Sequence, residues 1–105
     1  MEARQKVDAL LRKLLVETTG RANLYYQPGA NIRMKYPCIV YTMSRIQNNH
    51  ANDGVYAQRV FYTVTVIDTD PDSKIVAVVS ALPKCACDRQ FISENLYHTV
   101  FTLYS

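Results

Sequence analysis

The sequence contains little glycine, and this scarcity excludes several classes of enzyme. Its 105 residues include three glycines, Gly20, Gly29 and Gly54, so the glycine-rich loops that hold nucleotide phosphates are absent. No serine stands in the G-x-S-x-G context of a hydrolase nucleophile. The two histidines, His50 and His98, form no catalytic pair. We therefore expect no catalytic residues, no cofactor and no enzymatic activity.

Long apolar runs are also missing. No stretch approaches the ~20 apolar residues that a membrane-spanning helix needs. Residues 1–19 carry charges throughout and lack the continuous apolar segment of a signal peptide. We expect a protein that is made and assembled in the cytoplasm and has no membrane partner.

The sequence has no concentrated charge of one sign. Its 12 Lys and Arg residues and 9 Asp and Glu residues give a net charge of +3, and the basic residues are scattered along the chain. Proteins that bind a phosphate backbone usually gather Lys and Arg into a stripe or patch. The distribution therefore argues against nucleic acid as a direct binding partner.

Cysteine is scarce and odd in number. Three cysteines cannot complete a disulfide framework, and reduced thiols are the simpler interpretation. Cys85 and Cys87 lie two apart on a predicted strand, so their sulfurs share one face and, with Cys38 and His98, could form a four-ligand zinc site. The Cys spacing is too short for a zinc knuckle, however, and the predicted hairpin places His98 opposite Phe91. We expect no metal, and small apolar packing residues instead.

The residues that are present describe a folded chain. Hydrophobic residues make up 49 % and charged residues 20 %, as in ordinary soluble domains. A chain of this length buries roughly 65 % of the surface that its unfolded form exposes, so residues 1–105 are expected to form one domain. Eight tyrosines stand against three phenylalanines and no tryptophan. Tyrosine combines a large ring with a polar tip and suits surfaces that become buried on assembly.

Two amphipathic helices are predicted. The first covers residues 1–19 and ends at Gly20. Its apolar stripe consists of Val7, Leu10, Leu11, Leu14 and Leu15. The second follows Thr69, with Asp70 as N-cap, Pro71 in the first turn and Pro83 as the stop. Its stripe consists of Ile75, Val78, Val79 and Leu82.

Four strands are predicted in two hairpins. Residues 36–46 and 56–68 are rich in β-forming residues, and the polar segment 47–55 between them reads as a mobile loop. Residues 84–92 and 96–104 form the second hairpin, with a turn at 93–95. The order α-β-β-α-β-β indicates an α+β fold: a four-stranded antiparallel sheet with both helices packed on one face.

The predicted strands carry bulky groups on both faces. In residues 56–68, Val60, Tyr62 and Val64 share one face, and Phe61 and Ile67 share the other. A sheet covered by helices on one side only should be apolar on one side only. Either another subunit covers the second face, or the segment containing Tyr25 and Tyr26 folds across it. The sequence leaves both possibilities open.

The hairpin loop is the candidate contact region. It projects from the predicted body, and two arginines flank it. The candidate oligomer and partner contacts are Arg45, Asn48, Asn49, His50, Asn52, Asp53 and Arg59. The alternatives are an idle, solvated hairpin tip and solvated charges at the strand ends.

These same segments resemble a known family. The resemblance covers about residues 5–105 and rests on core and turn patterns: YYQP (25–28), MKYPCIVY (34–41), YTVTVID (62–68) with PDS (71–73), and NLYHTVFTLY (95–104). They look like the tail completion, or tail terminator, proteins from the neck of tailed bacteriophages. Cys85 and Cys87 match no functional motif of that family.

The resemblance implies a structural role in the virion. Tail terminators form a hexameric ring on the last ring of tail-tube protein, stop the tube from growing and present a surface to the head connector. DNA would then meet this chain only as it passes through the ring. The alternatives are a head-completion or other minor tail or neck protein, and a small non-catalytic binding module.

Overall fold

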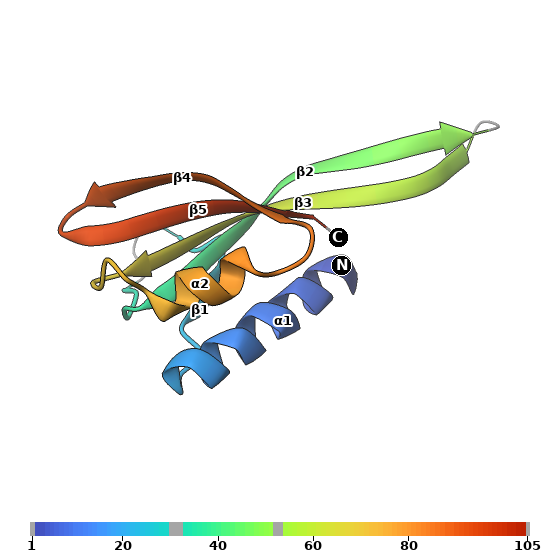
Figure 1. Ribbon diagram of the computed structural model, residues 1–105. Helices are drawn as coiled ribbons and strands as arrows, with labels where there is room; N and C mark the ends of the chain where they lie inside the picture. The colour runs from blue at the N-terminus through green and yellow to red at the C-terminus, as the bar shows by residue number, and fades with distance from the viewer. Residues whose placement is uncertain (1, 30–32, 52–53, 105) are drawn as a thin grey trace.

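The fold is an α+β sandwich of two layers. The computed structural model describes residues 2–29, 33–51 and 54–104, which form two helices and one five-stranded sheet. The elements are α1 (Glu2–Thr19), β1 (Leu24–Tyr26), β2 (Cys38–Ala51), β3 (Gly54–Asp68), α2 (Lys74–Ser80), β4 (Cys85–Ser93) and β5 (Leu96–Tyr104). The strand order is β1-β2-β3-β5-β4. Both helices lie on the same face of the sheet (Figure 1), as predicted.

The sheet differs from the prediction by one strand. β1 pairs in parallel with β2, with Leu24 opposite Ile39 and Tyr26 opposite Tyr41, so the sheet is mixed. The four-stranded, purely antiparallel sheet is therefore wrong. Three residues are too few to show the period-two alternation by which strands are recognised. The segment containing Tyr25 and Tyr26 therefore lies at the edge of the sheet.

Helix α1 follows its predicted pattern closely. Four residues of the stripe are buried: Val7, Leu11, Leu14 and Leu15. Leu10 lies at the margin of the stripe and is 41 % exposed. The helix ends where expected, because Gly20 adopts a φ of 77° and its N–H bonds the Val16 carbonyl at 2.9 Å. This left-handed conformation costs glycine little and terminates the helix.

The hairpin of β2 and β3 is longer than predicted. The two strands pair from Cys38 opposite Ile67 to Ala51 opposite Gly54, so the predicted loop 47–55 is wrong for every described residue within it. Asparagine, glutamine and histidine are poor strand formers, but the ladder bonds join backbone groups and tolerate solvated side chains. Residues 52 and 53 lie outside the described residues.

Helix α2 is shorter than predicted and is capped differently. It begins at Lys74 after the N-cap Ser73, which makes no side-chain capping bond. The predicted cap, Asp70, instead accepts the N–H of Asp72 at 2.9 Å, and Asp68 accepts the N–H of Asp70 at 3.0 Å. These bonds form two successive Asx turns, which delay the start of the helix. Its end at Ser80 precedes Pro83 by one short turn.

The second hairpin is close to the prediction. β5 covers residues 96–104 as expected, and β4 runs from Cys85 to Ser93. The turn consists of Glu94 and Asn95, with φ values of 52° and 63°. Positive φ at both central residues is the type I′ geometry that suits a two-residue hairpin. The predicted pairing of Phe91 with His98 is confirmed.

The core lies between the helices and one face of the sheet. Alternate residues of β3 supply its centre, and Val60, Tyr62 and Val64 share the buried face as predicted. Ile75 and Val79 cover it from α2. β4 extends past this cover at the free edge of the sheet, where every residue after Cys85 is exposed. The core therefore stabilises the body of the sheet and leaves the long hairpin and β4 outside it.

Candidate functional site

A two-stranded arm projects from the body (Figure 1). β5 pairs with β3 only from Phe61 to Asp68, and β1 pairs with β2 only from Ile39 to Tyr41. Within the described chain, residues 45–51 and 54–60 therefore pair only with each other, except that Arg45 pairs with Phe61 at the base. We call residues 45–51 and 54–60 the hairpin arm. The molecule measures 51 × 30 × 25 Å, and the arm extends along its long dimension.

A β-bulge separates the arm from the sheet. The register of β2 against β3 shifts between Met43 and Arg45, which leaves Ser44 unpaired. The Ser44 hydroxyl donates to the carbonyl of Phe61 at 3.1 Å. Bulges bend a strand and increase its local twist. This bulge therefore coincides with the point at which the arm leaves the plane of the body.

Two arginines and two aromatic rings meet at the base of the arm. The Arg45 Cζ lies 4.1 Å from the centroid of the Phe61 ring, and the Arg59 Cζ lies 5.1 Å from that of Tyr104. The two rings are 5.7 Å apart. We call these four residues the arm-base cluster. Both arginines are exposed, so the stacking orients the guanidinium groups while leaving them open to a partner.

The cluster lies on the face of the sheet opposite the helices. Residues Arg59, Phe61, Thr63 and Thr65 alternate with the buried residues of β3, as the sequence predicted. In the middle of this open face, Thr42, Thr63 and Thr102 stand side by side across three strands. Ile67 and Val100 are only 6 % and 7 % exposed. The sheet therefore hides more of its second apolar face than the sequence suggested.

The large exposed apolar side chains lie elsewhere. Among the side chains that the structure describes, they are Leu10, Val16 and Val78 on the helices, Ile46 in the arm, Phe91 and Ile92 in β4, and Tyr36. Ile92 is the most exposed, at 65 %. The Tyr25–Tyr26 segment does not cross the open face, because it forms the edge strand β1. The surplus apolar surface is thus spread over the arm, the β4 edge and the outer helix surfaces.

The predicted contact residues belong to the arm, but as strand residues. Asn49 and His50 lie in β2, opposite Ala57 and Val55. Asn48 lies opposite Gln58 and is exposed. Asn52 and Asp53 are outside the described residues. Arg45 and Arg59 do not face each other in register, because Arg45 pairs with Phe61 and Arg59 with Gln47.

Sequence reasoning missed the aromatic half of the arm-base cluster. The alternation of β3 already placed Phe61 on the same face as Arg59. Tyr104 comes from β5, and only the pairing of Phe61 with Tyr104 brings it beside them. The alternation of β3 could therefore identify the Phe61 ring, but only the strand order could identify the Tyr104 ring.

The structure does not bring the four residues of the hypothetical zinc site together, because β3 and β5 lie between Cys38 in β2 and the cysteines of β4. Cys38 is fully buried, and burial, followed by the nearby charge of Asp68, raises the pKa of its thiol to about 12. Burial also raises the pKa of Cys85, with smaller contributions from Cys87 and Asp88. Both thiols are therefore held in the neutral form in their buried surroundings. Within the described ranges, no three side chains of His, Cys, Asp or Glu lie close enough to hold a metal ion.

A polar network fixes α1 on the sheet. The hydroxyl of Tyr41 donates to Asp8 at 2.5 Å, and Asp8 also pairs with Arg12 at 3.2 Å and with Arg4 at 3.9 Å. The Arg4 guanidinium lies 4.9 Å from the ring centroid of Tyr26. Burial, and then the bond to Asp8, raise the pKa of Tyr41 to about 12. This network is structural, because it joins one helix to two neighbouring strands.

Sequence comparison does not assign this chain to a family. No family model matches it, and no curated protein matches it in sequence. Neither described helix combines the length and apolar character needed to span a membrane. The functional argument therefore rests on the geometry of the arm, the arm-base cluster and the exposed apolar surface.

Proposed function

We propose that this chain is a structural, self-associating protein of a tailed phage: a tail terminator, or tail completion protein, that forms a ring on the tail tube and joins it to the head connector. The observation that carries the proposal is the hairpin arm. It projects beyond the five-stranded sheet and pairs only with itself among the described residues. The family resemblance of the sequence supplies the assignment to the phage neck, and with it a hexameric ring.

The energetics of the arm favour a partner. An isolated two-stranded hairpin is at best marginally stable in water. Its outer edges carry backbone N–H and C=O groups that can pair with another chain. Ile46 adds an apolar side chain that is 43 % exposed on the arm. Contact with a neighbouring copy would cover both the edge and this side chain.

The position of the arm supports the proposed ring. The arm occupies one end of the long molecule, so it can reach a different surface on a neighbouring copy in a head-to-tail contact (Figure 1). Such heterologous contacts close into rings when the rotation per subunit divides a full turn. The exposed apolar surfaces of β4 and the helices would then contact the next copy, the tail tube or the head connector.

Light scattering with isolated tail tubes tests the proposal. The purified chain should form a ring-sized oligomer, either alone or on tube ends, and electron microscopy should show caps at one end of each tube. A chain that stays monomeric at high concentration with tubes present would refute the proposal. Binding to the head connector but not to tubes would point instead to a head-completion or other neck protein.

Gene order provides an independent check. Tail-tube and tape-measure genes beside this coding sequence would support the terminator. A host locus without virion genes would favour the small non-catalytic binding module.

A further inference from the structure

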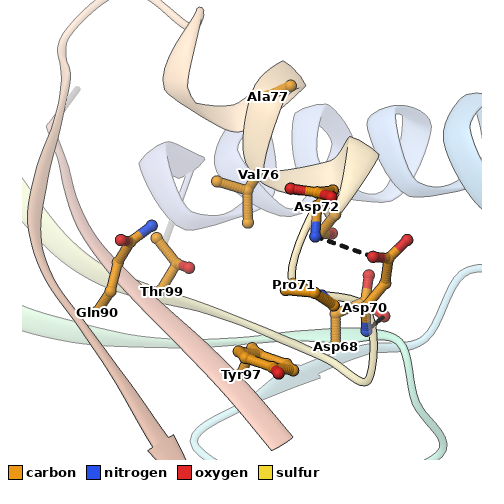
Figure 2. A pocket seen from close by; sticks show the side chains of 10 residues that line it. Asp68, Asp70, Pro71, Asp72, Val76, Ala77, Gln90, Tyr97 and Thr99 are labelled. Atoms are coloured by element: carbon orange, nitrogen blue, oxygen red, sulfur yellow. Dashed lines mark hydrogen bonds between the residues drawn. The ribbon is translucent and has the colours of Figure 1, made fainter.

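An acidic pocket lies at the end of the molecule that faces away from the arm. It has a volume of about 310 Å³, and it is lined by Asp68 at the end of β3 and by Asp70 and Asp72 from the turn before α2. Figure 2 shows this turn and α2 on one side of the pocket and Gln90, Thr99 and Tyr97 of β4 and β5 around the rest. The walls are therefore polar as well as acidic.

The polar groups of this pocket are not all satisfied. Ser73 lines it and is only 8 % exposed, yet its Oγ has no hydrogen-bond partner among the described residues. Within the same residues, the carboxylate of Asp72 takes part in no hydrogen bond or ion pair, and only the backbone N–H of Asp72 is bonded. A buried hydroxyl without a partner costs free energy until a ligand bonds it.

The hydrogen-bond acceptors of the pocket define its ligand. Carboxylates accept hydrogen bonds only, and the Ser73 hydroxyl and the Gln90 amide each offer an acceptor oxygen. A planar cation with several N–H donors fits these groups better than a compact ammonium does. The guanidinium of arginine has five such donors in a fixed fork.

Arg59 is a suitable arginine, but the Arg59 of the same copy cannot reach this pocket. Arg59 and Asp68 lie nine residues apart on the same strand, β3. At ~3.3 Å per residue, they are separated by about 30 Å. Figure 1 shows the arm and the turn before α2 at opposite ends of the molecule. Any pairing between them must therefore join two copies.

We propose that Arg59 of one copy enters the acidic pocket of the next copy and bonds Asp72 and the Ser73 hydroxyl. The inference rests on the proposed self-association and specifies its contact. Arg59 is exposed and makes no ion pair among the described residues. The contact is head to tail, so each copy offers one arginine and one pocket, as ring closure requires.

Charge reversal at each half of the contact tests the inference. Asp72→Arg changes a carboxylate that bonds no other group of the described chain, so the Asx turns remain. Arg59→Glu changes the other half. Each variant alone should associate about tenfold or more weakly than the wild type, because it places like charges together. Sedimentation velocity, alone and with tail tubes, measures the loss.

Mixing the two variants gives the sharper result. The Asp72→Arg copy keeps its native Arg59, and the Arg59→Glu copy keeps its native Asp72, so these two groups can pair as in the wild type. At the next junction, the glutamate introduced at position 59 of one copy meets the arginine introduced at position 72 of the other. The two charges are the same as in the wild type, but they have exchanged positions. Both contacts are attractive, so an equimolar mixture should assemble to near the wild-type level in alternating rings.

A matched pair of control variants separates this effect from a general change of charge. Glu17→Arg and Arg21→Glu make the same charge changes at positions away from the pocket and the arm. Each should assemble normally. If either control assembles as weakly as the contact variants, the loss is due to overall charge. That result would overturn the proposed Arg59–Asp72 contact.

The outcomes separate this inference from the proposed function. If the wild type assembles and either charge-reversal variant assembles equally well, the Arg59–Asp72 contact is wrong while the ring stands. Failure of the mixture to recover, when both variants keep the wild-type circular dichroism spectrum and melting temperature, also overturns the contact. A wild type that never assembles, even on tubes, removes the proposed function itself.

Discussion

Two buried tyrosines with opposite hydrogen-bond status stand side by side in the core. The rings of Tyr41 and Tyr62 are 6.2 Å apart, and both residues are fully buried. The Tyr41 hydroxyl donates to Asp8, whereas the Tyr62 hydroxyl has no partner among the described residues. A buried hydroxyl without a partner loses its bonds to water and gains none in exchange. The same substitution should therefore have opposite effects at the two positions.

Tyr62→Phe should leave the free energy of unfolding unchanged or raise it by up to about 1 kcal/mol. Tyr41→Phe removes a bond to a charged group that is partly exposed, and should lower it by about 1–2 kcal/mol. Urea unfolding at neutral pH measures both, and each variant serves as the control for the other. Equal destabilisation by both substitutions would mean that the Tyr62 hydroxyl does have a partner.

Alkaline pH should destabilise the fold through Cys38 and Tyr41. Burial raises the pKa of Cys38 from 9.0 to about 12, and burial with the bond to Asp8 raises the pKa of Tyr41 from 10.0 to about 12. The unfolded chain loses these protons first, so the stability they contribute is complete below about pH 9 and falls as the pH rises towards 12.

Urea unfolding between about pH 7 and pH 11 checks this dependence. Cys38→Ala should be less stable at neutral pH because it leaves a cavity, but its stability should decline less steeply between roughly pH 9 and pH 10. More alkaline solutions should still destabilise it, because Tyr41 remains. A variant whose stability falls with the wild-type slope throughout would show that the buried thiol does not carry the effect.

At the level of elements, the hairpin arm lies beyond the core of the body. The core cluster reaches Val60 at the base of the arm and no further among the described residues. Shortening the arm should therefore preserve the body. Replacing residues 48–58 with Asn-Gly keeps Gln47 opposite Arg59, as in the native register, and supplies a type I′ turn.

This shortened chain should keep its melting temperature to within a few degrees, since the core residues that the structure describes all lie outside the deleted segment. It should lose the ability to form rings, although Arg59 is retained. Circular dichroism melting and light scattering measure the two properties. A shortened chain that still assembles would show that the distal arm is dispensable, and a large fall in melting temperature would show that the arm supports the body.

At the scale of the whole molecule, complementary groups lie at the base of the arm and at the end that faces away from the arm. Arginines stacked on aromatic rings lie at the base of the arm, and three carboxylates lie around the far end of the same strand. One molecule cannot bring these groups together, but a neighbouring copy can. The exposed apolar side chains of β4 and the outer helix surfaces remain available for further contacts.

The sequence by itself determined the elements whose side chains alternate with a strong period. The stripe of α1, the two-faced alternation of β3 and the β5 strand all follow from which residues are apolar and how they are spaced. The helix end at Gly20 and the Glu94–Asn95 turn could also be predicted from the sequence, because each depends on the conformations that one or two residues can adopt.

The tertiary structure alone decided what depends on distant backbone partners. Residues 24–26 form β1 because their backbone pairs with the edge of β2. The polar arm is a hairpin because the backbone groups of its two strands pair with each other. The turn before α2 uses its carboxylates for Asx bonds instead of a helix cap. Hydrogen bonds between backbones carry no side-chain signature, so spacing and composition cannot reveal them.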